Sequence, residues 1–136
     1  MTFSKTLNLK TKGFCDIINV TDKVQKIISE SKVKDGLVCV FVKGSTCGVT
    51  QLEYEPNLVK DFQDLMEKIV PQDLPTQHGN TWGDDNGFSH LRASLIGPSV
   101  CMPIKAGNIV LGTWQQIVVC DFDNRSRERE VFVKII

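Results

Sequence analysis

Short runs of strand-forming residues, separated by turns, make up most of this chain. Residues 3–10 alternate polar and apolar side chains, and residues 37–42 are continuously apolar and rich in β-branched residues. The first pattern is typical of a half-buried strand and the second of a buried strand. The chain from residue 99 onward is β-rich, with polar turns near residues 105–108 and 123–128. Any fold for this sequence must therefore be built around β-structure.

Three segments have helical spacing or helix boundary signals. The first begins at Thr21, which we expect to act as its N-cap, and ends at the Lys34-Asp35-Gly36 turn. The second covers residues 57–70 and has a continuous apolar face. The third covers residues 90–96, with Ser89 or Asn86 as its cap.

The remaining predicted strands are short. They cover residues 14–20, 49–54, 99–104, 109–111, 114–122 and 130–136. We expect residues 3–10 and 14–20 to form an opening hairpin, because only a short turn separates them.

Length and composition predict one domain, residues 1–136, with its own hydrophobic core. The chain has 16 Lys and Arg and 16 Asp and Glu, so no overall positive field favours nucleic acid as a partner. The five cysteines include no Cys-x-x-Cys pair and are expected to be reduced. No apolar run is long enough to span a bilayer or to act as a signal sequence, so we expect no membrane partner and a cytoplasmic location.

Both histidines lie in a polar, glycine-rich stretch, residues 78–90, next to two carboxylates. The surrounding residues 71–89 form an irregular region of a length that is uncommon in compact domains unless it is functional or covered by a partner. Histidine titrates near neutral pH and is the commonest metal ligand, so the stretch suggests a site. A solvated loop followed by a capped helix is the alternative interpretation.

A metal site is one chemistry that these residues allow. It would use His78 and His90 with Glu53, Asp84 or Asp85, because imidazole and carboxylate groups together suit zinc or another divalent ion. The spacing matches no established metal-ligand signature.

An anion site is a second possibility. The small, hydroxylic turn at residues 44–48 follows a buried strand, and such turns present N–H groups and hydroxyls to anions. Arg92, Lys105 and Thr113 would complete the site, since donors on small residues and a guanidinium match phosphate geometry. A nucleophilic site would need an activated thiol, and we expect Cys47 to be buried and inert instead.

Trp114-Gln115-Gln116 begins an otherwise apolar strand. Alternation places Trp114 and Gln116 on one face and Gln115 on the other. An indole can stack on a heterocycle while an amide hydrogen-bonds it. A polar edge strand with a packed tryptophan is the alternative.

The run HGNTWGDDNGFSHLRASLIGPS from His78 and the run LGTWQQI from Leu111 closely resemble the YjbQ-like family, called the secondary thiamine-phosphate synthase family. The resemblance extends from the N-terminal strands to Ile136. It implies an α+β fold, a single compact YjbQ-like domain with a mixed, twisted β-sheet or sandwich and about two to three helices. It also implies a homotrimer with its sites near subunit interfaces.

The resemblance carries roles over to individual residues. It implies that the catalytic residues are His78, His90, Arg92, Glu53 and Asp85. With the hydroxyls of the 44–48 turn added, the substrate-binding residues would be Ser45, Thr46, Asn86, Ser94, Gly112, Thr113, Trp114 and Gln115. His78 and His90 would be the ligands of a divalent metal, zinc or magnesium.

One position departs from the family pattern. Many members begin the 44–48 turn with a histidine, where this chain has Gly44. A site that requires three histidines is therefore not available here.

The activity named for the family joins a hydroxymethylpyrimidine pyrophosphate to a thiazole phosphate with loss of pyrophosphate. Such a reaction needs cationic or N–H donors for the pyrophosphate and a flat pocket for the pyrimidine. Arg92, Thr113 and the 44–48 turn would supply the donors, and Trp114 and Gln115 the pocket. We therefore expect a small phosphorylated heterocycle or anion as the partner.

The alternative function belongs to another class, a non-catalytic trimeric binding protein for a small anionic metabolite or a metal ion. The two functions differ in the surroundings that they need. A catalytic site should have its histidines facing a pocket with room for two substrates, whereas a binding module would enclose them in a closed ligand shell.

Overall fold

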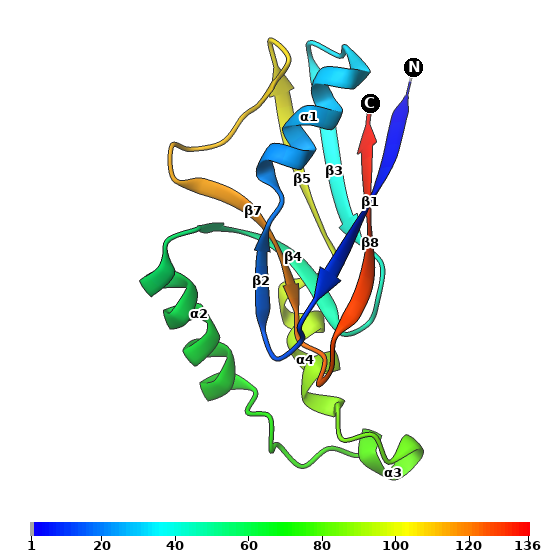
Figure 1. Cartoon of the computed structure of the whole chain (residues 1–136), viewed down its shortest axis with the longest axis vertical. Coiled ribbons are helices and arrows are strands. Elements are labelled where there is room, and N and C mark those ends of the chain that lie inside the picture. The colour runs from blue at the N-terminus through cyan, green and yellow to red at the C-terminus, as the bar shows by residue number, and fades with distance from the viewer. Residues whose placement is uncertain (1) are drawn as a thin grey trace.

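The computed structural model describes residues 2–136. Within these residues the strands are β1 (Phe3–Thr11), β2 (Asp16–Asn19), β3 (Gly36–Val42), β4 (Cys47–Glu53), β5 (Ser99–Lys105), β6 (Asn108–Ile109), β7 (Gln115–Asp121) and β8 (Arg127–Ile135). The helices are α1 (Thr21–Ser31), α2 (Pro56–Ile69), α3 (His78–Trp82) and α4 (Gly87–Ile96). Figure 1 shows an elongated molecule with α1 towards one end and α3 at the other.

The strands form two sheets. The larger has the order β1-β8-β3-β5-β6, and the smaller has the order β2-β7-β4. The last strand, β8, pairs with the first strand, β1, so the two ends of the chain lie side by side (Figure 1). The α+β class expected from the sequence is confirmed. Every described strand pair is antiparallel, however, where the family resemblance implied a mixed sheet.

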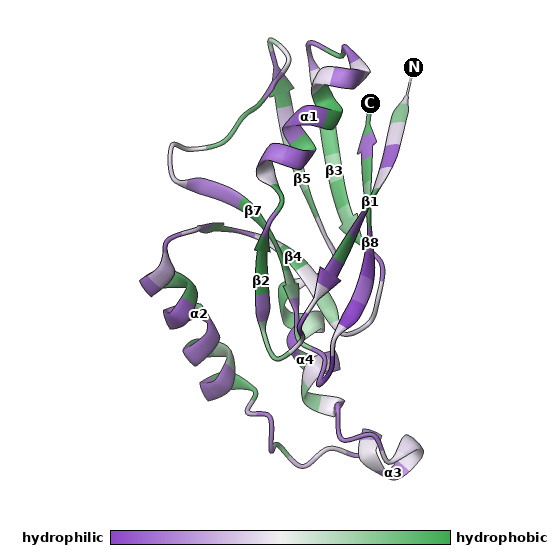
Figure 2. Cartoon of the chain, in the orientation of Figure 1, coloured by the Kyte–Doolittle hydropathy of each residue, from purple (hydrophilic) through white to green (hydrophobic). Residues whose placement is uncertain are grey.

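The inner faces of the two sheets share the main core. Val38, Val40 and Val42 of β3 point inward and are fully buried, as expected for a continuous apolar run. α1 adds one apolar face to this core, made of Val24, Ile27 and Ile28. In Figure 2 the central strands are hydrophobic, whereas the solvent side of α1 is hydrophilic.

The other face of the smaller sheet is covered by α2 and α4. Its core contains Val118 and Cys120 of β7, Met66 of α2 and Ala93 of α4. α2 stands beside the sheet and presents a hydrophilic outer surface (Figure 2). The two helices therefore bury the side of the small sheet that the large sheet does not reach.

The expected opening hairpin is wrong. β1 pairs with β8 in the large sheet, whereas β2 pairs with β7 in the small one. In the turn between them Phe14 and Cys15 have positive φ values of 53° and 64°, and the Phe14 N–H donates to the Asp123 carbonyl at 2.7 Å. A short turn between two strand patterns is a local signal, and it does not reveal that the chain passes from one sheet to the other.

Thr21 does not cap α1 as expected, because the N-cap position is Val20 and Thr21 is the first helical residue. The Thr21 hydroxyl instead accepts from the Ile117 N–H at 2.8 Å and donates to Asn19 Oδ1 at 2.7 Å. It therefore ties the helix to β7 rather than closing the helix end.

The other helix boundaries also shift. α2 begins at Pro56, and the Glu55 side chain accepts from the next free N–H groups of the first turn. α4 begins at Gly87, three residues before the predicted start, and α3 lies in the region predicted to be irregular. Asn86 occupies the N-cap position of α4 but makes no side-chain capping bond. No helix within residues 2–136 is both long and apolar enough to cross a membrane.

Candidate functional site

The two histidines lie together near the end of the molecule that carries α3. His78 is the first residue of α3, and His90 lies in the first turn of α4. Their ring centroids are 4.5 Å apart and the rings are tilted by 38°. The structure therefore brings together the two histidines of the stretch that suggested a site.

The backbone between α3 and α4 fixes this separation. Gly83 and Asp85 both have positive φ, 71° and 52°. The Asn124 side chain donates to the Asp84 carbonyl at 3.0 Å and holds the loop against the β7–β8 turn. Gly87 lies so close to Thr76 that an added Cβ would be 2.2 Å from the Thr76 hydroxyl. α4 can therefore approach the preceding chain only with glycine at this position.

Of the three carboxylates considered for the histidine site, Asp84 is the one that the structure places beside the pair. Its Oδ1 lies 3.2 Å from His78 Nδ1. That ring nitrogen is buried, and within residues 2–136 it makes no hydrogen bond of good geometry. Burial, and then the neighbouring His78, lower the pKa of His90. Burial and the adjacent imidazole thus both disfavour the protonated form of His90.

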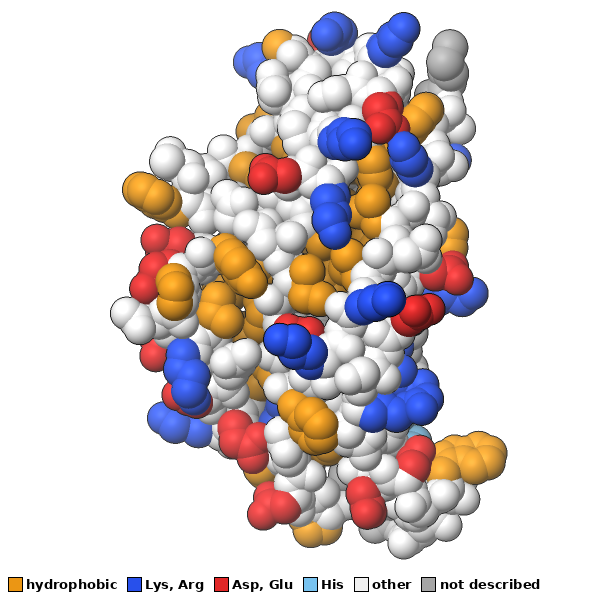
Figure 3. All heavy atoms as spheres, viewed as in Figure 1, with side chains coloured by type: hydrophobic (Ala, Val, Ile, Leu, Met, Phe, Trp, Pro, Cys, Tyr) orange, Lys and Arg blue, Asp and Glu red, His pale blue; other side chains and the backbone are white. Residues whose placement is uncertain are grey.

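The pair forms one wall of a cleft of about 500 Å³. The turn Gly44-Ser45-Thr46 lines the same cleft, as do Arg127 and Arg129 of β8. Figure 3 shows a histidine at the lower right of the molecule, beside basic side chains. The cleft thus combines imidazoles, guanidinium groups and hydroxyls.

Arg129 belongs to a buried network of charges beneath the cleft. It donates to both oxygens of Asp121, from Nε at 2.7 Å and from a terminal nitrogen at 3.0 Å. The same terminal nitrogen donates to Thr46 Oγ1 at 2.6 Å. Burial would lower the pKa of Arg129, but the hydrogen bonds to Asp121 and the negative charges of Asp121 and Asp123 together outweigh burial and raise it. Arg129 is therefore a fixed positive charge.

Asp123 is the second buried carboxylate of this network. It accepts from Arg127 Nε at 2.8 Å, from Thr46 Oγ1 at 3.0 Å and from the Asn124 N–H at 2.7 Å. Burial would raise the pKa of Asp123, but the hydrogen bonds from Asn124, Asn86, Thr46 and Arg127 outweigh burial and lower it. Asp123 therefore stays ionised, and the Thr46 hydroxyl is held between Arg129 and Asp123.

The side-chain amide of Asn86 lies between the cleft and this network. With its nitrogen turned to Asp84 it donates to both carboxylate oxygens, at 3.1 and 3.2 Å. With its nitrogen turned to Asp123 it donates to Oδ1 at 3.4 Å. Asn86 is thus placed beside the histidines, as predicted, and it links them to the buried charges.

Sequence reasoning missed the four charged residues of the network, Asp121, Asp123, Arg127 and Arg129. A signal was present in the alternation of β8, where Arg127 and Arg129 share the inward face with Val131. A charged residue at an inward position needs a buried partner. The buried partners are Asp121, the last residue of β7, and Asp123, two residues later. The spacing of residues within β8 alone does not identify them.

A second group of predicted residues lies at the other end of β4. β4 begins at Cys47, beside the cleft, and ends at Glu53. Glu53 lines a separate pocket of about 410 Å³ with Thr113 and Trp114. At about 3.3 Å per residue, the strand separates cleft and pocket by about 20 Å. One chain therefore does not bring Glu53, Thr113 and Trp114 to the histidines.

Gln115 and Gly112 stabilise the loop at this second pocket. Gln115 Oε1 accepts from the Gly112 N–H at 2.9 Å, and its Nε2 donates to Gln51 Oε1 at 3.1 Å. Trp114 is 71% exposed. The indole, rather than the Gln115 amide, is the group available to a ligand here.

Arg92 points away from the histidine cleft. Its Nε donates to the Val70 carbonyl at 2.8 Å, a terminal nitrogen donates to Glu67 at 2.7 Å, and the guanidinium lies over the Phe88 ring. The side chain is 1% exposed. Residues two apart on a helix face different sides, so Arg92 cannot share the His90 side. The expectation that both face one phosphate is wrong within the chain.

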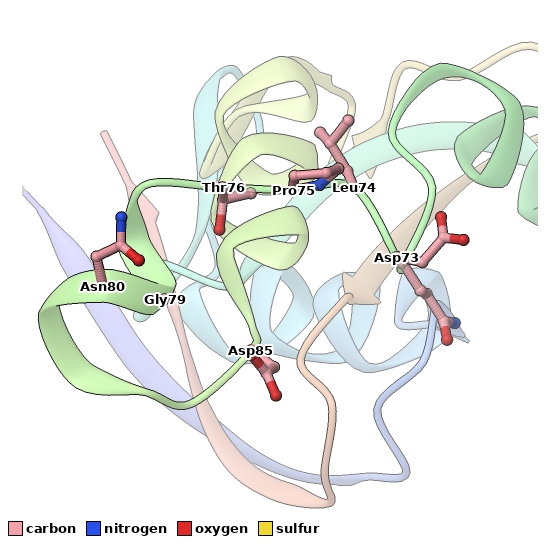
Figure 4. Close-up of a pocket in the computed structure, with 8 residues that line it drawn as sticks. Asp73, Leu74, Pro75, Thr76, Gly79, Asn80 and Asp85 are labelled. Carbon is pink, nitrogen blue, oxygen red and sulfur yellow. The ribbon is translucent and has the colours of Figure 1, made fainter.

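Asp85 lines a neighbouring hollow of about 520 Å³ with Thr76, Gly79 and Asn80 (Figure 4). This hollow lies along the chain that leads into α3. Asp84 and Asp85, although adjacent in sequence, therefore line different cavities.

Ser94 lines a smaller hollow of about 240 Å³, together with Ser45, Cys47 and His90. Its hydroxyl donates to the His90 carbonyl at 2.9 Å. Burial raises the pKa of Cys47 to about 11. This agrees with the expectation of an inert thiol.

The described residues of one chain do not fit the metal site considered from the sequence. Within residues 2–136 no group of three or more His, Cys, Asp or Glu side chains is arranged to hold a metal ion. Glu53 and Asp85 do not line the histidine cleft, and Asp84, which lies 3.2 Å from His78 Nδ1, does not complete a set of three ligands with the two histidines. The chemistry of the cleft is therefore derived from its imidazoles, guanidinium groups and hydroxyls.

Comparison with known proteins agrees with the sequence motifs. The family model described as UPF0047 protein YjbQ-like matches residues 5–136. A UPF0047 protein of Archaeoglobus fulgidus is 38% identical over 130 residues, which cover 96% of this chain and 98% of that protein. A UPF0047 protein of Methanocaldococcus jannaschii is 35% identical over 129 residues, which cover 94% of this chain and 90% of that protein.

Solved structures have the same fold. A YbjQ-like protein of Sulfolobus solfataricus matches with a TM-score of 0.92 at 27% sequence identity. The match covers 99% of this chain and 96% of that protein's chain. A protein of the YjbQ/UPF0047 family from Clostridium acetobutylicum matches with a TM-score of 0.89 at 36% sequence identity. The match covers 97% of this chain and 99% of that protein's chain. The chain therefore belongs to the YjbQ-like UPF0047 family.

Proposed function

We propose that this protein is an enzyme that acts on a phosphorylated heterocycle, with an activity of the secondary thiamine-phosphate synthase type. The observation that carries the proposal is the histidine pair. His78 and His90 lie 4.5 Å apart at a cleft, and His78 Nδ1 is a buried nitrogen without a well-aligned partner in the described chain. Both histidines line the cleft together with guanidinium groups and hydroxyls, so their imidazoles can donate hydrogen bonds to a phosphorylated substrate bound there.

The size of the cleft supports an enzyme over a closed binding shell. Its volume of about 500 Å³ lies in the range of small-molecule sites. The hollow of about 240 Å³ that Ser94 lines shares His90 and Ser45 with it. His90 therefore borders two adjoining spaces, which suits two substrates.

Arg127 is the group that we assign to the phosphate. Its side chain is 33% exposed, whereas Arg129 is 9% exposed and holds Asp121. A guanidinium in a fixed position can stabilise the charge that develops on a departing phosphate. Ser45, in the facing turn, adds a hydroxyl.

The proposed reaction breaks one bond and forms one. The bond between the exocyclic carbon of the pyrimidine and the pyrophosphate oxygen breaks, and the oxygen keeps the electron pair. The thiazole ring nitrogen gives its lone pair to the same carbon. An imidazole of the pair donates a hydrogen bond to the departing pyrophosphate, as an oriented general acid would. The products are thiamine phosphate and pyrophosphate.

The proposal includes the homotrimer that the resemblance implied. Cleft and Trp114 pocket lie about 20 Å apart in one chain, at the two ends of β4. They meet only if the pocket of one copy faces the cleft of another. Trp114 would then stack on the heterocycle whose phosphate lies at Arg127.

A second candidate is a binding protein for a small anion. The observation in its favour is that Arg127 and Arg129 are both held by buried carboxylates. Such fixed guanidinium groups bind an anion without any proton transfer. In this case the histidines would only complete the ligand contacts.

One assay separates the two candidates. Purified protein is incubated with hydroxymethylpyrimidine pyrophosphate and thiazole phosphate, and thiamine phosphate is measured by chromatography. Binding of inorganic pyrophosphate is measured by calorimetry on the same preparation. A His90→Ala protein purified in the same way controls for a contaminating synthase. Turnover that depends on His90 supports the enzyme, and binding without turnover supports the binding protein. The absence of both turnover and binding would contradict both candidates.

A further inference from the structure

The five cysteines fall into two groups. Cys15, Cys47 and Cys120 are buried in the cores, and burial raises the pKa of Cys15 and Cys47 to about 11. Cys39 of β3 and Cys101 of β5 lie on the outer face of the large sheet, where Cys39 is half-buried and Cys101 is exposed. Only this second group is accessible to reagents in solution.

Cys39 and Cys101 are directly opposite each other in the antiparallel pairing of β3 and β5. The same register places Leu37 opposite Pro103 and Phe41 opposite Ser99 on this face. No helix of the described chain packs on these residues, because α1 joins the opposite, inner face of the sheet. The two thiols are therefore neighbours on an open surface.

The hydrogen bonds of β3 show which kind of pair this is. The Val42 N–H donates to the Pro98 carbonyl, in register with β5. Leu37 exchanges hydrogen bonds with Ile136, in register with β8. Because the direction of bonding alternates along a strand, even-numbered residues of β3 bond to β5 and odd-numbered ones to β8. Cys39 and Cys101 thus form a non-hydrogen-bonded pair.

This kind of pair has the shorter separation of an antiparallel ladder. Its Cα atoms lie about 4.5 Å apart and its side chains are the closer ones. Disulfides span Cα separations of about 4.4 to 6.8 Å. The pair can therefore be bridged without a change of strand register.

We propose that Cys39 and Cys101 form a reversible disulfide across β3 and β5 by exchange with a low-molecular-weight disulfide. The Cys101 thiolate attacks one sulfur of the small disulfide and expels the other half as a thiolate. Cys39, after losing its proton to solvent, attacks the Cys101 sulfur of this mixed disulfide and expels the second thiol. The protein loses two electrons and two protons, and the small disulfide becomes two thiols.

The order of attack follows from the surroundings. Cys101 is the exposed partner, so the small disulfide reaches it first. Burial, and then the proximity of Cys101, raise the pKa of Cys39. Cys39 therefore acts as the resolving thiol, where proximity compensates for a low thiolate fraction.

The bridge would join two strands that lead to the histidine cleft. β3 runs into the turn that contains Ser45, and β5 follows directly after α4, which carries His90. The site is distinct from the cleft, and its formation does not depend on the proposed activity.

The test is oxidation of the full-length protein by oxidised glutathione at mildly alkaline pH. We expect the loss of two of the five thiols, a mass lower by two hydrogens and a single linked peptide pair that contains Cys39 and Cys101. Dithiothreitol should reverse all three changes. Thiol titration of the unfolded protein and peptide mapping without reduction provide the readouts.

Two variants test the order of steps. Cys39→Ser should retain one glutathione on Cys101 as a stable mixed disulfide, because no resolving thiol is present. The Cys101→Ser protein should keep all four of its remaining thiols during the same oxidation. A wild-type protein that keeps glutathione on Cys101, links two copies through Cys101 or keeps all five thiols would overturn the proposal.

Discussion

At the scale of single residues, His90 is the group on which the proposed chemistry depends most directly. It borders both adjoining cavities and lies against His78. We expect His90→Ala to lower turnover by about 100- to 1,000-fold, the usual contribution of a positioned acid or base. Steady-state kinetics with both phosphorylated substrates would measure the change.

The matched control is the next residue of the same helix. Leu91 is exposed and lines none of the cavities described. Leu91→Ala should keep turnover within about twofold, because it alters the helix surface without touching the cleft. Equal losses in the two variants would mean that α4 was disturbed as a whole.

The lowered pKa of His90 also predicts a pH dependence of stability. Because the folded chain holds this proton less tightly than the unfolded chain, the unfolded state binds more protons between the lowered pKa and the ordinary value of 6.5. Stability should therefore be full above this window and fall as the pH drops through it. Asp123, whose pKa is lowered as well, loses its contribution only at more acidic pH.

The measurement is the Tm of wild type and His90→Asn from about pH 8 to about pH 5. We expect a smaller decrease in the variant, since asparagine has no group that titrates in this range. Asp84, Asp123 and His78 remain around the site in both proteins. Parallel curves would show that His90 does not cause the decrease.

Gly44 departs from the pattern that the family resemblance implied, and the structure predicts the effect of placing a histidine there. Gly44 has a φ of +142°, and an added Cβ would lie 2.5 Å from an Arg129 nitrogen and 2.9 Å from Cys47 Sγ. Gly44→His should therefore destabilise the protein by about 2 kcal/mol or more, through backbone strain and displacement of Arg129.

Gly83→Ala separates these two causes, because Gly83 also has positive φ but nothing lies within 4 Å of its added Cβ. It should cost about 1 kcal/mol, the strain alone. Urea unfolding measures both free energies. A Gly44→His protein as stable as wild type would contradict the steric account of this turn.

At the scale of helices and strands, Arg92 connects α4 to the end of α2. Its removal leaves the Val70 carbonyl without its donor and Phe88 without its covering group. We expect Arg92→Ala to lower the free energy of unfolding by about 3 kcal/mol, from the lost packing and the unpaired carbonyl. Urea unfolding again provides the measurement.

Arg92→Met distinguishes packing from hydrogen bonding. The methionine keeps the apolar stem over Phe88, so we expect a loss of only about 1 to 2 kcal/mol. A folded Arg92→Met protein should retain its turnover, because Arg92 does not line the cleft. A lower kcat in this folded variant would mean that Arg92 takes part directly in catalysis.

Elements with a strong local pattern were predictable from the sequence. The apolar spacing of Val24, Ile27 and Ile28 predicted α1, and the run at residues 37–42 predicted β3, because each burial pattern repeats within a few residues. The partition of β1 and β2 between two sheets was not predictable, since it depends on pairing with β8 and β7, which lie about a hundred or more residues further along the chain.

The candidate site was predictable only in part, for the same reason. The histidines lie in one stretch of sequence and were identified together. The polar network beneath them includes Thr46, Asp121 and Arg129, which the fold alone brings within hydrogen-bonding distance. Arg92 was misplaced because closeness in sequence was taken as closeness in space.

At the scale of the whole molecule, the proposed site needs more than one copy of the chain. We expect sedimentation equilibrium to give a trimer at micromolar concentration. Trp114→Ala should lower turnover with little effect on the unfolding of the protomer, because the indole is exposed in one chain. A monomer with full activity would contradict a shared site.

Mixing two inactive variants tests the sharing itself. When His90→Ala and Trp114→Ala copies are unfolded together and reassembled, some clefts with an intact His90 meet pockets with an intact Trp114. Activity should then return to the mixture. Each variant reassembled alone serves as a control. A mixture that stays inactive would mean that the cleft and the Trp114 pocket do not form one shared site.

The position of cleft and pocket at opposite ends of β4 also bears on symmetry. A twofold dimer engages both ends only if the two β4 strands run antiparallel along the contact, whereas a head-to-tail contact uses one cleft and one pocket at a time. Head-to-tail contacts end only when rotation closes a ring, and otherwise continue as a helical filament. The angle between successive copies is set by residues outside the cleft, and it then determines whether the copies close into a ring or continue as a fibre.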